Sequence, residues 1–141
     1  MKEQPIFDHE KLDVYQVELS FVASSAILLS EIRAAGEGLY REICDQLDRA
    51  SLSSLLNTAE GNGKRQGKQR AKFFDDARGS AVECAACLDV AVARRLVEPS
   101  AMSEGKASLE EIARLLAGLL GRLGYRFDEP STRVREDESQ G

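Results

Sequence analysis

The segment Asn57-Thr58-Ala59-Glu60-Gly61-Asn62-Gly63-Lys64-Arg65, followed by Ala77-Arg78-Gly79-Ser80, decides the fold. Its glycines and basic residues interrupt two long amphipathic patterns, so it predicts a turn between two helices. Because glycine adopts helix-terminating conformations at low cost, Gly61 and Gly63 are expected to end the first of these helices.

Apolar residues recur at steps of three and four along the chain, which indicates helices. The pattern predicts helices over about residues 8–35, 39–59 and 66–97, and a fourth that begins at Ser103 or Ser108 and ends near residue 123. No strand pattern is found. Four helices with short connections predict an all-α, antiparallel up-down-up-down four-helix bundle.

The same spacing predicts which helix faces form the core. The first helix is expected to bury Leu12, Tyr15, Leu19, Val22, Ala26 and Leu29, and the third Phe74, Ala77, Ala81, Cys84, Leu88 and Ala91. Small residues dominate the second set, so backbones should approach closely there. A close helix crossing is expected to explain Gly79, since glycine in mid-helix costs roughly 1 kcal/mol relative to alanine.

Length and composition indicate one soluble domain. The chain has 141 residues, of which 43% are hydrophobic and 30% charged, enough to bury a core without disulfides. Residues 1–127 are predicted to form the bundle. Residues 128–141 contain five acidic and two basic residues and are predicted to be a disordered acidic tail.

The cysteines and the apolar segments indicate the cellular compartment of the protein. An odd count of three cysteines and a charged N-terminus predict a cytoplasmic protein without a secretory segment. The longest uncharged stretch, residues 19–30, is too short to span a bilayer. No contact with a membrane is expected.

Four groups of residues resemble a known family of four-helix bundles. They are Gln46-Leu47-x-Arg49-Ala50-Ser51, Asn57-x-Ala59-Glu60-Gly61-x-Gly63-Lys64, Phe73 with Phe74, and Ala77-x-Gly79-Ser80-x-x-Glu83. The family includes the proteins encoded by intervening sequences in bacterial large ribosomal RNA genes and the accessory protein of diversity-generating retroelements. The resemblance spans residues 7–123.

The resemblance implies a bacterial bundle that assembles with itself into a ring-like homo-oligomer, a homopentamer. It also implies that some members bind nucleic acid or a reverse transcriptase. This chain departs from the nucleic-acid-binding members because its net charge is −5, whereas those members are strongly basic. Thr58 also stands where the family usually has a large aliphatic residue.

A basic cluster is the first candidate site. Residues 61–72 contain no acid, and their basic residues are Lys64, Arg65, Lys68, Arg70 and Lys72. The cluster could neutralise phosphates of RNA or DNA. The alternative is a solvated turn leading into a helix, which the lack of stacking aromatics within the turn favours. The segment is not a P-loop, because the Gly-Lys-Ser/Thr ending and a preceding strand are missing.

A second group belongs to the same turn and is predicted to be structural. Asn57 and Glu60 are spaced to share a helix face, and are expected to bind backbone groups of the turn and to pair with Arg78. Gly61, Gly63 and Gly79 complete this motif. The alternative is a polar pocket at the end of the bundle.

No catalytic, metal or cofactor site is predicted. Cys84 and Cys87 have the spacing of a zinc or redox motif, but a second ligand pair is missing, so they are interpreted as core residues. His9 is the only histidine and is expected to be exposed. Tyr125 and Phe127 are expected to pack on the bundle or on a neighbouring subunit.

Together these observations predict a non-enzymatic, oligomeric scaffold that contacts nucleic acid or a ribonucleoprotein through residues 61–72. The alternative is an adaptor that binds only an unknown protein partner and no nucleic acid. The net charge of −5 weighs against the first of these and is compatible with the second.

Overall fold

A computed structural model of the chain describes residues 7–36 and 40–125. It contains a short 3-10 helix, η1 (Asp8–Lys11), and the α-helices α1 (Asp13–Gly36), α2 (Arg41–Asn62), α3 (Gly67–Ala93) and α4 (Pro99–Arg122). No strand occurs within the two described ranges, so the prediction of an all-α fold with four helices is confirmed. Phe127 and the predicted acidic tail lie outside the described residues.

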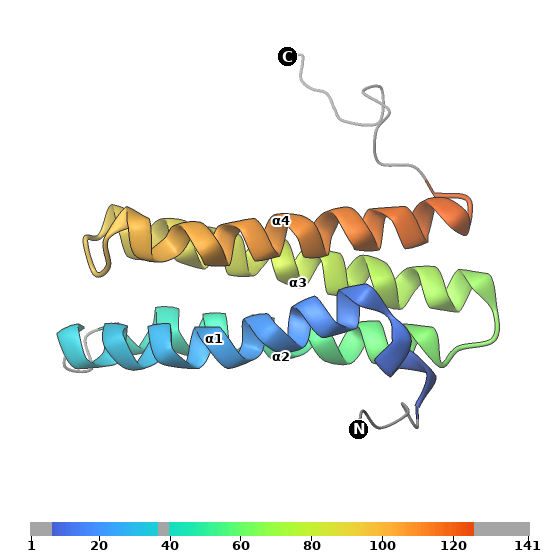
Figure 1. The fold of residues 1–141 in the computed structure, drawn as a ribbon, viewed down its shortest axis with the longest axis horizontal. Coiled ribbons are helices and arrows are strands. Elements are labelled where there is room, and N and C mark those ends of the chain that lie inside the picture. The colour runs from blue at the N-terminus through green and yellow to red at the C-terminus, as the bar shows by residue number, and fades with distance from the viewer. Residues whose placement is uncertain (1–6, 37–39, 126–141) are drawn as a thin grey trace, which may run out of the picture.

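The four α-helices pack side by side along their lengths (Figure 1). α1 contacts α2 and α4, and α3 contacts the same two helices, so each helix has two close neighbours. The last turn of each helix lies at the same end of the molecule as the first turn of the next (Figure 1). Among the described helices, none is both long and apolar enough to cross a membrane.

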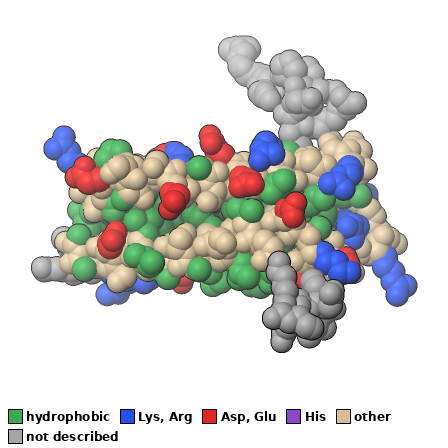
Figure 2. All heavy atoms as spheres, viewed as in Figure 1, with side chains coloured by type: hydrophobic (Ala, Val, Ile, Leu, Met, Phe, Trp, Pro, Cys, Tyr) green, Lys and Arg blue, Asp and Glu red, His purple; other side chains and the backbone are tan. Residues whose placement is uncertain are grey.

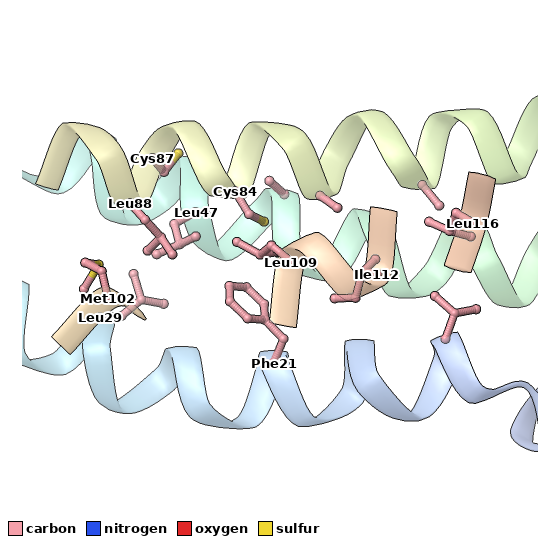
Figure 3. Close-up of a cluster of buried hydrophobic side chains, with 14 of the residues drawn as sticks. Phe21, Leu29, Leu47, Cys84, Cys87, Leu88, Met102, Leu109, Ile112 and Leu116 are labelled. Atoms are coloured by element: carbon pink, nitrogen blue, oxygen red, sulfur yellow. The ribbon is translucent and has the colours of Figure 1, made fainter. Parts of the chain in front are cut away.

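Core packing confirms the faces predicted for α3. All members of its predicted face are buried, including the small residues Ala77, Ala81 and Cys84. Leu109, Ile112 and Leu116 of α4 also point into the core (Figure 3). Burial of such apolar surface is the main stabilising contribution to a bundle of this size.

The face predicted for α1 is largely wrong. The buried residues of α1 are Val14, Glu18, Phe21, Ser25, Leu29 and Ile32. Of the predicted set only Leu29 is buried, and Leu19 is 43% exposed. The prediction failed because α1 carries apolar residues on two faces, and the face that enters the core includes a glutamate and a serine, which a hydrophobic pattern rejects.

Three helix ends also differ from those predicted. α1 begins at Asp13 because Leu12 is extended, with φ −77° and ψ 128°. α3 ends at Ala93, because Arg95 adopts the left-handed conformation, with φ 59°, just beyond the helix. α4 already begins at Pro99, since proline suits the first turn of a helix, where its missing N–H is not needed.

Candidate functional site

The basic turn, residues 61–72, joins α2 to α3 at one end of the bundle (Figure 1). Gly61 does not end α2 as predicted but lies inside the helix and is buried. A Cβ atom on Gly61 would lie 3.0 Å from the Cβ of Phe73 and 3.0 Å from the ring of Phe74. Glycine is therefore needed here for close packing. Gly63 caps the helix with an ordinary φ of −83°.

Arg70 connects the backbone of the turn to α3. Its guanidinium donates hydrogen bonds to the carbonyl oxygens of Asn62 at 2.8 Å and Lys64 at 3.1 Å, and to Asn62 Oδ1 at 3.3 Å. It also lies 5.6 Å from the ring centre of Phe74. Because the last carbonyls of a helix lack partners within the helix, Arg70 acts as a cap for α2.

Asn62 extends this network to the start of the chain. Its Nδ2 donates a hydrogen bond to Asp8 Oδ2 at 3.0 Å, which links α2 to η1. This bond is the main cause that lowers the pKa of the exposed Asp8 carboxyl below its usual value. The turn is thus held by residues from η1, α2 and α3.

Lys64 and Lys72 flank the aromatic ring of Phe73, at 5.2 Å and 5.4 Å from its centre. Both lysines are also ion-paired, Lys64 of the connection to Glu60 of α2 at 3.0 Å and Lys72 to Asp76 within α3 at 3.2 Å. Both acids lie outside residues 61–72 but at the four-residue helical spacing that brings side chains together. The four-residue spacing could have predicted the two ion pairs, and Phe73 just after the turn could have predicted the contacts of the lysines with an aromatic ring. The sequence interpretation used neither signal.

Lys72 is exposed although it is ion-paired, and the other exposed cations of the turn are Arg65 and Lys68. Within the described part of the chain, neither forms a hydrogen bond or an ion pair. Lys68 lines a groove of about 600 Å³ between the start of α3 and the end of α4, with Lys72, Leu120 and Tyr125. Asp75 also lines this groove, so its charge is mixed.

Asn57 and Glu60, predicted to be structural, both have partners close in sequence, Asn57 on α2 itself and Glu60 in the connection that follows α2. Asn57 Nδ2 donates to the carbonyl oxygen of Ser53 at 2.8 Å and to Ser53 Oγ at 3.1 Å. Ser53 Oγ lies 2.9 Å from Ser80 Oγ of α3, so Asn57 supports a polar link between the two helices. Glu60 pairs with Lys64.

Arg78 and Gly79 lie on α3, away from the turn. Arg78 is half-buried. It lies about three helical turns before Asp89 of α3, and Asp89 is ion-paired to Lys106 of α4. The pairing of Arg78 with Asn57 or Glu60 stays a prediction. The close helix crossing expected at Gly79 is wrong for this chain, because a Cβ atom there would meet nothing within 4 Å apart from its chain neighbours and the backbone of its own helix.

The residues considered for metal or redox chemistry are packed side chains. Cys44, Cys84 and Cys87 are buried free thiols, and burial raises the pKa of Cys84 to about 12. His9 is not exposed as expected; its ring packs against Phe7 and, at 4.6 Å, against Tyr15. The described residues contain no group of three metal-binding side chains.

A buried carboxyl group on α1 was missed by the sequence interpretation. Glu18 is 1% exposed, and its Oε2 lies 2.7 Å from Ser54 Oγ and 2.7 Å from Thr58 Oγ1 of α2. Desolvation raises the pKa of Glu18 to about 7, although the two hydroxyl groups oppose the rise. Thr58, which stands where the resemblance implies an aliphatic residue, is thus a partner for Glu18.

Comparison with known proteins agrees with this architecture. A solved structure from Bacteroides thetaiotaomicron, a protein of unknown function from the S23 ribosomal protein family, superposes with a TM-score of 0.70. It is 16% identical and covers 76% of this chain and 97% of its own, so it shows the fold alone. No curated protein matches. The 23S rRNA-intervening sequence proteins match over residues 10–118, and since this range includes all the α-helices but the last turn of α4, the chain belongs to that family.

Proposed function

We propose that the protein is a cytoplasmic, non-enzymatic scaffold, an antiparallel up-down-up-down bundle that assembles with itself into a ring-like homopentamer. The alternating ends at which the helices are joined support the antiparallel order (Figure 1). The observation that carries the assembly is the second apolar face of α1. The pentameric size rests on the resemblance to the family.

Large apolar side chains are exposed on both α1 and α2. Leu19 and Ile27 lie two turns apart on α1 and are 43% and 67% exposed, and Leu56 of α2 is 62% exposed. Val22 and Tyr15 of α1 are only partly covered. Apolar surface also shows along α1 in Figure 2. Large apolar side chains that gather on one side of a molecule indicate a protein interface, and a second copy of the chain would cover them symmetrically.

The oligomeric mass tests the assembly. In light scattering coupled to size exclusion, the wild type should have about five times the 15.5 kDa mass of one chain. Ile27→Glu with Leu56→Glu should yield a folded species of lower mass, because two buried, unpaired charges are costly at an interface. The matched control is Val82→Glu on α3, where the native side chain is 53% exposed. A wild-type monomer would refute the assembly.

We further propose that the scaffold contacts nucleic acid or a ribonucleoprotein through the basic turn. Arg65 and Lys68 support this contact most directly, because both are exposed and unpaired in the described structure. Assembly would bring several such turns together and raise the effective affinity of each. Lys64 and Lys72 supply less free charge, since both are ion-paired.

Fluorescence anisotropy with labelled RNA and DNA across a salt series tests this contact. Affinity should fall steeply as salt rises, because bound counterions are released from phosphates. Arg65→Glu with Lys68→Glu should weaken binding at least tenfold without loss of helicity. Arg41→Glu with Arg94→Glu, two exposed cations at the opposite end of the bundle, serves as the control. Equal affinity of both double variants would remove the basic turn from the proposal.

The alternative function is an adaptor that binds only protein. The net charge of −5 and the ion pairs of Lys64 and Lys72 favour it. Absence of RNA and DNA binding at low salt, with the assembly intact, would leave the adaptor as the function to pursue.

A further inference from the structure

The buried Glu18 carboxyl is the most unusual polar group of the core. It projects from α1 toward α2, where Ser54 Oγ and Thr58 Oγ1 both lie 2.7 Å from its Oε2. Its other oxygen, Oε1, is buried and has no hydrogen-bond partner. A buried carboxylate usually needs a cation or several donors, because burial penalises the charged form. The partners of Glu18 are instead two neutral hydroxyl groups, and both of them contact the same carboxyl oxygen.

The hydrogen atoms available at this contact favour the neutral acid. The Thr58 hydroxyl has one hydrogen but two acceptors in reach, Glu18 Oε2 at 2.7 Å and the carbonyl oxygen of Ser54 at 3.0 Å. With a proton on Oε2, Glu18 can donate to Thr58, Thr58 can donate to the Ser54 carbonyl, and Ser54 Oγ can donate to Glu18. Every short contact then contains its own hydrogen.

No charge in the surroundings offsets ionisation of Glu18. The causes of its shifted pKa are burial, which raises it, and the hydroxyls of Ser54 and Thr58, which lower it. No titratable or charged group of α1, α2, α3 or α4 among the described residues contributes to the shift. The protonation state of Glu18 therefore depends on burial at the α1–α2 contact, and burial in turn depends on α1 remaining docked.

We propose that Glu18, Ser54 and Thr58 form a proton-dependent latch that holds α1 against α2. The latch is closed when Glu18 is a neutral carboxylic acid, and ionisation of Glu18 loosens the docking of α1. This function is independent of what the scaffold binds. It makes the stability of the bundle sensitive to pH in the neutral range, where an ordinary glutamate no longer titrates.

The sign of the pH dependence follows from the two pKa values. The pKa of Glu18 is 4.5 when the chain is unfolded and about 7 in the bundle. Below pH 4.5 both states are protonated, and Glu18 has no effect on stability. As pH rises from 4.5 to about 7, only the unfolded state ionises, so stability falls. Above that window the loss is complete and constant.

Chemical denaturation of the full chain at pH 5 and pH 8 tests the latch. The two pKa values predict that Glu18 raises the unfolding equilibrium constant by roughly 70-fold between these pH values. Glu18→Gln keeps the shape of the side chain without its titration, so this component of the pH dependence should be absent. Glu111→Gln, at an exposed position on α4, should behave as the wild type. Equal pH dependence in wild type and Glu18→Gln would overturn the latch.

A second measurement covers the case in which Glu18→Gln does not fold. The carboxyl carbon of Glu18 can be followed by NMR in the wild-type protein with labelled glutamate. Its resonance should titrate near pH 7, together with faster hydrogen exchange of α1 amides at higher pH. A midpoint at the ordinary value for glutamate, or α1 exchange that does not change with Glu18 ionisation, would refute the proposal.

Discussion

At the scale of single residues, two glycines of the same motif have opposite roles. Gly61 lies against Phe73 and Phe74, and no side chain fits between them. Gly79 is on the exposed side of α3 and faces open space. Glycine at the first position is required by packing, whereas at the second it only adds conformational freedom to the unfolded chain.

Alanine substitutions should therefore change stability in opposite directions. Gly61→Ala should lower the free energy of unfolding by about 1–3 kcal/mol, because its Cβ overlaps the two phenylalanines. Gly79→Ala should raise it by about 0.5–1 kcal/mol, since alanine favours an exposed helix interior. Urea denaturation of both variants checks the signs. Destabilisation by Gly79→Ala would indicate that a neighbouring subunit packs on this position.

At the scale of secondary structure elements, Arg70 decides how α2 passes into α3. Arg70→Ala should lower the free energy of unfolding by about 1–3 kcal/mol, because backbone carbonyls at the end of α2 lose a charged donor. Arg65→Ala, in the same turn but without such contacts, should change it by less than about 0.5 kcal/mol. Thermal unfolding compares the two. Equal stability of both variants would show that the carbonyls of Asn62 and Lys64 do not depend on Arg70.

The elements also show what the sequence could and could not predict. The core face of α3 was predictable because its buried residues form a single stripe at helical spacing. The face of α1 was not, because Leu19 and Val22 continue a better stripe than the one that Glu18 and Ser25 interrupt. The start of α4 was predicted too late, at Ser103 or Ser108, because proline can occupy the first turn of a helix, as Pro99 does here.

The basic turn was located correctly by its composition, but the state of its charges was not. Lys64 and Lys72 have acidic partners four residues away in the sequence. Arg70 donates a hydrogen bond to a backbone carbonyl oxygen of α2. The Glu18 site could not be predicted, because it needs the register of α1 on α2, which local patterns do not contain. A buried acid becomes visible only when its hydroxyl partners are placed in space.

At the scale of the whole molecule, the latch and the proposed assembly both depend on the position of α1. Glu18 faces the core of the bundle, while the neighbouring Leu19 belongs to the exposed apolar face. A change in how α1 docks would therefore move the surface that a second copy covers. Proton uptake and self-association are then expected to favour each other, because both require α1 in the same position.

The rate at which the three buried thiols react with an added reagent reports how often the helices around them separate. Cys44 lies on α2, and Cys84 and Cys87 lie on α3, all buried between helices. A thiol-specific reagent must wait until these helices separate, and the high pKa of Cys84 keeps its thiol unreactive before then. Since the described part of α1 carries no cysteine, undocking of α1 and separation of α2 from α3 would be timed separately, the first by amide exchange and the second by thiol chemistry.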